Sequence, residues 1–200
     1  MHYLSIETPE RKVVPFILAA VAIGITTAIQ SIAAALKWYI PSWISSPSAF
    51  AIYGLLYTGF ENYFWRWSLF RSLGLIRVPN LKGEWNSTMS SSLENFEKEY
   101  CGPIFISQTW SRVHIFFNGR EAFSHSQSAS IVFMGPSRVS FSYVYQSEQR
   151  PEFSNNEYLH FGTCRLIGVL GENGIATSLE GSYFTDKSRN TYGRIKFERK

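Results

Sequence analysis

A run of 24 residues without a charged side chain, residues 13–36, constrains this chain more than any other feature. As an α-helix the run would be about 36 Å long, which is enough to cross the hydrocarbon core of a membrane. A cleaved signal peptide has a shorter apolar stretch, and Pro15 lies at the start of the run, where a helix tolerates proline. We therefore predict a membrane-spanning helix over residues 13–36.

A second apolar segment, residues 48–70, predicts a helical hairpin. It follows Pro47, a favourable residue for a first helical turn, and the connection over residues 37–47 carries one charge. Aromatic residues gather at the two ends of this hairpin, as in the interfacial belts of membrane proteins. They are Trp38, Tyr39, Trp43, Tyr63, Phe64, Trp65 and Trp67. An amphipathic helix lying on the membrane surface is the alternative for this segment.

Basic residues flank the hairpin at its two outer ends. They are Arg11 and Lys12 before the first helix, and Arg66, Arg71 and Arg77 after the second. The positive-inside rule then places both ends in the cytoplasm. Residues 1–12 are expected to be a cytosolic N-terminus, residues 37–47 a periplasmic loop, residues 71–80 a linker and residues 81–200 a cytosolic domain. The two cysteines, Cys101 and Cys164, would be free thiols there.

Glu61 is the one acidic residue near a membrane-embedded stretch. It could form a polar contact between helices or line a pore. A position at the headgroup level, close to Trp65 and Arg66, is the simpler interpretation. The first helix is also rich in alanine and glycine, which would allow close helix packing and oligomerisation.

Residues 81–200 alternate between apolar and polar side chains, which is typical of half-buried antiparallel strands. We expect seven or eight strands and an additional strand near residues 97–100. Within one long strand over residues 104–117 we expect a bulge or bend near Ser111 and Arg112. The segment Gly83-Glu84-Trp85 is similar to the first strand of lipocalin-like barrels. We predict an all-β domain, an eight-stranded antiparallel lipocalin-like β-barrel that can hold one small ligand. A β-sandwich is the alternative.

Charge and motif content exclude several function classes. The sequence pI is about 9.1, but residues 81–200 carry 13 Lys and Arg against 12 Asp and Glu, which argues against binding long nucleic acid. The four histidines lack the spacing of metal ligands, and the chain has no C-x-x-C, P-loop or G-x-S-x-G motif. We therefore expect a protein without enzymatic activity, metal or cofactor.

The predicted strands instead carry groups that could bind a ligand. Tyr143 and Tyr145 share a face with Val139 and Phe141 and could point into the barrel. Further candidates on strands are Gln108, Trp110, Ser126, Ser128, Thr163 and Tyr183. Aromatic faces stack on bases, while amides and hydroxyls bind base edges. Arg189, in the turn before the last strand, could bind a phosphate. Each of these residues could also have a purely structural role.

A hairpin followed by a β-rich domain resembles a known family, the two-transmembrane β-barrel effectors of bacterial CBASS anti-phage signalling. These are the STING-like, CD-NTase-associated membrane effectors, also described as SMODS-associating 2TM β-strand-rich domains. The resemblance rests on Gly83-Glu84-Trp85, Gln108-Thr109-Trp110, the serines between residues 124 and 130, Tyr143-Val144-Tyr145, His160-Phe161-Gly162-Thr163 and residues 179–185 followed by Arg189 and Gly193. Asp186 and Lys187, before Arg189, depart from the family pattern.

The resemblance implies an anti-phage effector in the bacterial inner membrane. A partner CD-NTase would make a 3′,3′-linked cyclic dinucleotide, the barrel would bind it, and a homo-oligomer would form. The helices would then disrupt the membrane lipid and kill the infected cell. The residues alone also allow a membrane-tethered barrel that binds a lipid or another apolar ligand, or a structural subunit of a larger membrane complex.

Overall fold

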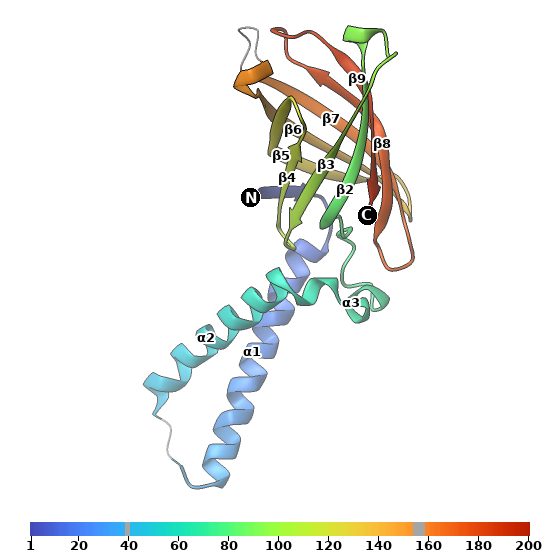
Figure 1. Ribbon diagram of the computed structural model, residues 1–200. Coiled ribbons are helices and arrows are strands. Elements are labelled where there is room, and N and C mark those ends of the chain that lie inside the picture. The colour runs from blue at the N-terminus through green and yellow to red at the C-terminus, as the bar shows by residue number, and fades with distance from the viewer. Residues whose placement is uncertain (39–40, 154–158) are drawn as a thin grey trace. The chain divides into compact units, whose positions relative to one another are not determined.

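The computed structural model describes residues 1–38, 41–153 and 159–200, with the backbone alone over residues 42–47. The chain divides into two compact units (Figure 1). Thr8–Arg77 form a helical unit, while Met1–Glu7 and Val78–Lys200 together form a barrel unit. The helical unit is therefore inserted between the first strand and the remaining strands of the barrel unit.

The helical unit consists of two antiparallel helices in mutual contact, α1 (Glu10–Ala35) and α2 (Ser42–Asn62), followed by η1 (Phe64–Arg66) and α3 (Ser68–Ser72). Among the described residues, α1 is the one helix long and apolar enough to cross a membrane. Its apolar side chains point outward, with Phe16 77% and Ile23 61% exposed. Such a surface is expected of a helix that contacts lipid. Glu61 lies in the last turn of α2.

The aromatic residues at the ends of the hairpin differ in their surroundings. Trp38, Tyr63 and Trp67 are exposed. Trp65 is completely buried, so its assignment to an aromatic belt is wrong: its ring packs inside the protein. Tyr39 lies outside the described residues, and the side chain of Trp43 is not described.

The barrel unit is one sheet that closes on itself. Its strands are β1 (His2–Ile6), β2 (Gly83–Ser91), β3 (Glu99–Gln108), β4 (Arg112–Asn118), β5 (Ala122–Phe133), β6 (Arg138–Gln149), β7 (Leu159–Leu170), β8 (Ala176–Thr185) and β9 (Tyr192–Arg199). The order around the barrel is β1-β4-β3-β2-β9-β8-β7-β6-β5. Strands β2 to β9 pair antiparallel, as the alternating sequence predicts.

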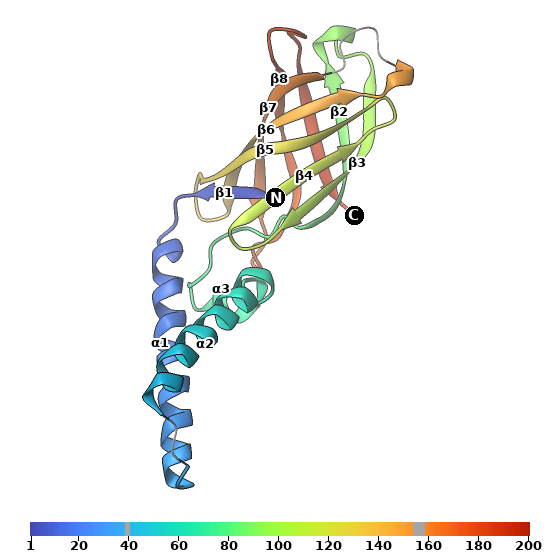
Figure 2. The ribbon, with the colours of Figure 1, turned by 90° about the vertical axis from the view of Figure 1, so that its left-hand side faces the viewer.

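Strand β1 is the part of the barrel that the sequence did not reveal. We expected strands only within residues 81–200, but β1 lies in the N-terminal segment and pairs antiparallel with β4 and parallel with β5 (Figure 2). Strands β4 and β5 pair directly only near their shared turn, from Phe116 to Asn118 on β4. Farther from that turn, β1 lies between β4 and β5, and the side chain of Leu4 is buried. The strand thus satisfies backbone groups that would otherwise be left unpaired at a gap in the sheet.

Two other details of the strand prediction are corrected. The stretch over residues 104–117 is two strands and not one, because β3 ends at Gln108 and β4 begins at Arg112. The chain does bend at Ser111, where a bulge or bend was predicted. Residues 99 and 100 begin β3 and are not a separate strand. A register shift does occur, between Ser126 and Ser128 on β5.

The barrel interior is packed in one part and hollow in another. Its packed part contains fully buried large side chains from most strands, namely Trp85, Trp110, Phe141, Phe197, Leu166, Leu179, Val113 and Val139. Burying one such side chain stabilises a protein by about 1.5–3 kcal/mol. The residues of the hollow part come from strand ends and from the η2 segment (Ser92–Glu94), the β4–β5 turn and the β8–β9 loop.

Candidate ligand-binding chamber

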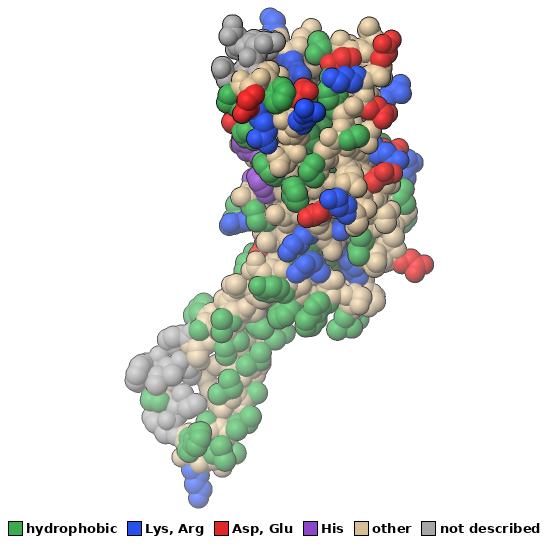
Figure 3. Space-filling model, viewed as in Figure 1, with side chains coloured by type: hydrophobic (Ala, Val, Ile, Leu, Met, Phe, Trp, Pro, Cys, Tyr) green, Lys and Arg blue, Asp and Glu red, His purple; other side chains and the backbone are tan. Residues whose placement is uncertain are grey.

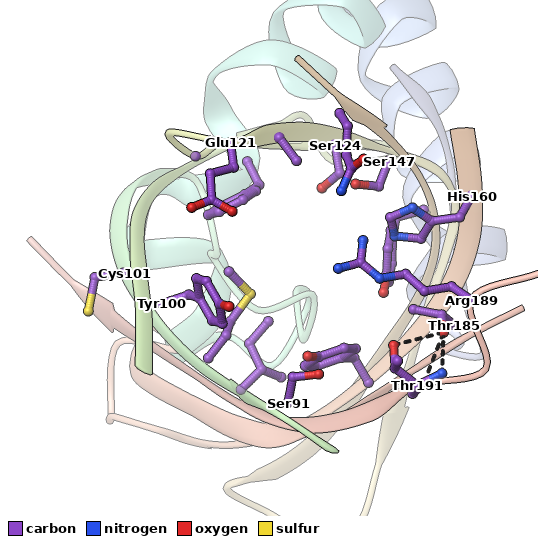
Figure 4. Close-up of a pocket in the computed structure, with 18 of the residues that line it drawn as sticks. Ser91, Tyr100, Cys101, Glu121, Ser124, Ser147, His160, Thr185, Arg189 and Thr191 are labelled. Atoms are coloured by element: carbon purple, nitrogen blue, oxygen red, sulfur yellow. Dashed lines mark hydrogen bonds between the residues drawn. The ribbon is translucent and has the colours of Figure 1, made fainter. Parts of the chain in front are cut away.

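The hollow part of the barrel is a chamber of about 330 Å³ (Figure 4). Its size lies within the range of small-molecule sites in proteins. Apolar side chains, among them Ile104 and Ile195, form part of its lining, and charged and hydroxyl-bearing side chains form the rest. The chamber therefore suits a ligand with both flat apolar surfaces and polar groups.

A row of aromatic rings on β6 leads from the packed core into the chamber. Ring centroids are 5.7 Å apart for Phe141 and Tyr143, and 6.0 Å apart for Tyr143 and Tyr145. Alternation places these three residues on the inner face of the strand. The ring of His160, on neighbouring β7, lies edge-on to Tyr145 at 6.5 Å. Tyr143 is buried, so Tyr145 is the more accessible ring of the row.

Two glycines make room for the tyrosine rings. Tyr145 is paired across the sheet with Gly162, and Tyr183 is paired with Gly193. A Cβ atom on Gly162 would lie 2.3 Å from Cζ of Tyr145, and one on Gly193 would lie 2.4 Å from Cε1 of Tyr183. Each ring therefore lies against bare backbone of the next strand, which leaves the middle of the chamber open.

The β8–β9 loop carries Arg189 into this space. Figure 4 shows its guanidinium group pointing toward the middle of the chamber, beside His160. The carboxylate of Asp186 fixes the start of the loop, because it accepts hydrogen bonds from the backbone N–H of Phe161 and from the hydroxyl of Ser188. Thr185 and Thr191 hold the two sides of the loop together through their hydroxyls, which are 3.0 Å apart.

Burial and the Arg189 charge change how the neighbouring groups titrate. Burial, assisted by the guanidinium, lowers the pKa of His160 to about 4, so this ring is neutral at neutral pH. Burial raises the pKa of Tyr145, and raises that of Cys164 to about 12. Arg189 is therefore the cationic group that this side of the chamber presents to a ligand at neutral pH.

The chamber brings together four of the residues predicted from sequence. They are Tyr143, Tyr145, Tyr183 and Arg189. The other five lie outside its lining. Ser128 and Thr163 are exposed on outward positions of their strands, and Gln108, Trp110 and Ser126 are buried in the barrel wall or core.

The buried polar residues among these five have structural partners. The Gln108 amide accepts a hydrogen bond from the N–H of Leu81 and donates one to the carbonyl of Pro79. The Ser126 hydroxyl accepts a hydrogen bond from the N–H of Ile115 and lies 2.7 Å from Nε2 of His2 on β1. These side chains stabilise the barrel, so we do not include them in the candidate site.

Several lining residues were not among the sequence candidates. They include His160, Tyr100, Ser147, Thr185, Glu94 and Glu121. His160 had a usable signal, since it alternates with Cys164 and Leu166 on the inner face of β7. Apolar residues at outward positions, such as Phe161 and Val169, concealed that alternation.

A closed sheet around a chamber with inward aromatic rings and an inward guanidinium has the architecture of a small-molecule-binding barrel. Comparison with known proteins then gives the family. The chain belongs to the family described as Cap15, cyclic dinucleotide receptor domain, whose model matches residues 76–199. The resemblance to CBASS membrane effectors is thereby confirmed.

Two curated relatives carry the name CD-NTase-associated protein 15. The protein from Yersinia aleksiciae is 29% identical over 168 residues, which cover 80% of this chain and 74% of the relative. The protein from Staphylococcus schleiferi is 28% identical over 132 residues, which cover 64% of each chain. The matched part is thus just under two thirds of the second relative's length.

Proposed function

We propose that this protein is a CBASS effector whose barrel binds a cyclic dinucleotide in the chamber and whose helical unit acts on the bacterial inner membrane. The observation that carries the proposal is the Arg189 guanidinium, which points into a chamber lined by tyrosines. A guanidinium binds phosphate oxygens through paired N–H donors, and tyrosine rings stack on bases. Phosphate would bind at Arg189, and a base would stack on Tyr145 or Tyr183.

The same geometry favours a polar ligand over a lipid. A lipocalin-like barrel that holds an acyl chain needs a long apolar cavity, whereas here the interior beyond Phe141 is filled by fully buried side chains. The charged side chains of Arg189, Glu94 and Glu121 line the remaining space. We therefore favour a nucleotide as the ligand over the lipid alternative.

Chain connectivity supports a hairpin that crosses the membrane twice. The chain leaves the barrel unit after Glu7 and returns to it at Val78. Figure 3 shows charged side chains scattered over the visible face of the barrel unit, whereas hydrophobic side chains predominate on the visible face of the helical unit. A folded barrel of this kind lies on one side of a membrane, so the inserted segment must cross an even number of times. If α1 is one membrane span, residues 48–70 form the second span.

The basic flanks of the helical unit favour a barrel on the cytoplasmic side. This position suits a receptor for a nucleotide that a cytosolic CD-NTase makes. A ligand can activate such an effector only by binding its assembled state more tightly than its inactive state. Cyclic dinucleotide binding would therefore favour a homo-oligomer, in which several hairpins together disrupt the membrane.

The test is calorimetric titration of the full chain in lipid nanodiscs with a panel of 3′,3′-linked cyclic dinucleotides. The unmodified protein should bind at least one member. Arg189→Gln should weaken that binding by about 10- to 100-fold, the value of a charged hydrogen bond. Lys187→Gln removes the same charge from an exposed position of the same loop and should have little effect. A full chain that binds no panel member would refute the proposal.

A further inference from the structure

Strand β1 fills a slot between β4 and β5 in the barrel wall (Figure 2). Near their shared turn β4 and β5 pair directly, and the last of these direct pairs joins Phe116 to His125. Beyond that pair, the five residues of β1 lie between the two strands. Each of the strands β2 to β9 pairs with a strand next to it along the chain, whereas the whole helical unit separates β1 from its partners. No turn therefore holds β1 in its slot.

The pairing that holds β1 is short. Its register with β4 covers His2 and Tyr3, and its register with β5 covers residues 4–6. By comparison, the register of β6 with β7 runs over residues 138–148 of β6. Short segments at the end of a chain open at a lower free-energy cost than strands in the middle of a sheet. We therefore expect β1 to detach from the barrel more readily than any other strand.

The slot is nevertheless specific for the side chains of β1. The side chain of Leu4 is buried, and Nε2 of His2 lies 2.7 Å from the hydroxyl oxygen of Ser126 on β5. The guanidinium of Arg112 on β4 lies over the ring of Tyr3, 4.9 Å from its centroid. Every copy of the protein has the same strand and the same slot, so β1 of a second copy can make each of these contacts. Exchange of an identical element between copies is for this reason a low-cost route to an assembly.

An emptied slot would bind another strand. A closed barrel has no unpaired edge, but the departure of β1 exposes backbone N–H and C=O groups on β4 and on β5. Edges of this kind bind extended segments by strand addition. Residues 2–6 of a second copy are the occupant that matches both the backbone of the slot and the pocket for Leu4.

The slot is connected to the chamber and to the helical unit through the chain. Phe117, Gly119 and Ser124, at the joined end of β4 and β5, line the chamber, so a ligand there would contact the two strands that form the slot. Only residues 7–9 separate β1 from α1. A ligand that binds more tightly when the slot holds the strand of another copy would therefore favour assembly.

We propose that copies of this protein exchange β1 when they assemble, so that residues 2–6 of one copy fill the slot of another. The inference rests on the proposed function, since a cyclic dinucleotide in the chamber is what starts the assembly. Each copy gives one strand and receives one. The barrel of one copy is then joined by pairing to the strand that leads into α1 of another copy.

Disulfide trapping tests the exchange. Tyr3→Cys and Arg112→Cys place cysteines at exposed, directly paired positions of β1 and β4, where the Cα atoms of paired residues are close enough for a disulfide. The two full-length variants, each carrying Cys101→Ser to remove the exposed native thiol, are mixed in liposomes. The probe is the tightest-binding member of the 3′,3′-linked cyclic dinucleotide panel. After oxidation, disulfides between position 3 of one chain and position 112 of another should be at least about tenfold more abundant with the probe than without it.

Val169→Cys is the matched control for Arg112→Cys. Val169 is exposed on β7, for which the described structure gives no pairing with β1, so this variant should form no probe-dependent disulfide with Tyr3→Cys. A double variant with Tyr3→Cys and Arg112→Cys in one chain gives a second test. Its disulfide forms within the chain before the probe is added and holds β1 in its own slot. This variant should still bind the probe in calorimetry, but its assembly should be lost until a reductant is added.

Three results would overturn the exchange while leaving the proposed function intact. The first is probe-induced assembly without the disulfide between positions 3 and 112 of different chains. The second is an equal yield of that disulfide with and without the probe, and the third is normal assembly of the oxidised double variant. Binding without assembly would overturn the exchange and the proposed oligomer together. Binding of no panel member would refute the proposed function and the exchange with it. Thermal unfolding verifies that each variant is folded.

Discussion

Replacing Leu4 by alanine tests whether β1 is a structural part of the barrel wall. The Leu4 side chain is 5% exposed, so the substitution removes buried apolar atoms and leaves a cavity. Buried leucine-to-alanine changes destabilise proteins by about 2–5 kcal/mol, and we expect about 3 kcal/mol here. For a unit of this size that loss lowers the midpoint of thermal unfolding by about 10 °C.

The neighbouring Tyr3 is 72% exposed, and its ring contacts Arg112 at 4.9 Å. Tyr3→Ala should therefore cost about 0.5–1 kcal/mol, although it removes more atoms.

The assay combines thermal unfolding of the full chain in detergent with hydrogen exchange followed by mass spectrometry. In Leu4→Ala, exchange should accelerate in β4 and β5, because these strands lose a hydrogen-bonded neighbour whenever β1 detaches. Exchange in β8, which has no pairing with β1, should change least. The reasoning is refuted if the two variants, Leu4→Ala and Tyr3→Ala, have the same midpoint of thermal unfolding and neither changes hydrogen exchange in β4 and β5. That result would mean that β1 is not part of the barrel wall.

Three further predictions concern the chamber. In Gly162→Ala the new Cβ would overlap the ring of Tyr145, so ligand affinity measured by calorimetry should fall by about tenfold or more. The free energy of unfolding should decrease as pH falls from about 6.5 toward 4, because His160 takes up a proton in the unfolded chain but stays neutral in the folded one. In a timed alkylation experiment at neutral pH, the exposed thiol of Cys101 should react quickly. Buried Cys164, with its pKa raised to about 12, should react only after unfolding.

Each of these predictions has a control and a contradicting result. Gly24→Ala introduces a methyl group with no neighbour within 4 Å and should leave affinity unchanged; equal affinity in Gly162→Ala would contradict the first prediction. His160→Gln should flatten the pH profile of unfolding, because it removes the group whose pKa differs between the folded and unfolded chain. The second prediction fails if the His160 variant keeps the original profile. Rapid alkylation of two thiols in the folded protein would contradict the third.

Local patterns in the sequence were sufficient for much of the fold. The uncharged run predicted α1, and the alternation on β6 placed Phe141, Tyr143 and Tyr145 on one inner face. Strand β1 could not be predicted in this way, because it has five residues and its partners, β4 and β5, lie more than 100 residues away in sequence. Its identity as a strand depends on a gap that exists only once the sheet has formed.

The same distinction, between local sequence patterns and features that depend on the folded sheet, applies to the residues of the candidate site. Tyr143, Tyr145, Tyr183 and Arg189 could be selected because each lies on an alternating strand or in the turn next to one. Glu94 and Glu121, which also line the chamber, could not be selected, since they lie in segments that resemble solvated loops. Closure of the barrel brings these segments opposite the β8–β9 loop. Gln108 was selected for the hydrogen-bonding capacity of its amide, but the backbone groups of Pro79 and Leu81 already use that capacity.

The position of β1 also determines when the barrel can be completed during synthesis. Residues 2–6 are synthesised before the other strands of the barrel, and their parallel partner on β5 extends to Ile131. At about 5–20 residues per second, β1 waits about 6–25 s for this partner. Helices α1 and α2 lie between the two in the chain, so both are synthesised before the barrel can close. The receptor unit is therefore completed only after the helical unit is available for insertion, and a ligand-binding barrel does not form ahead of its membrane segment.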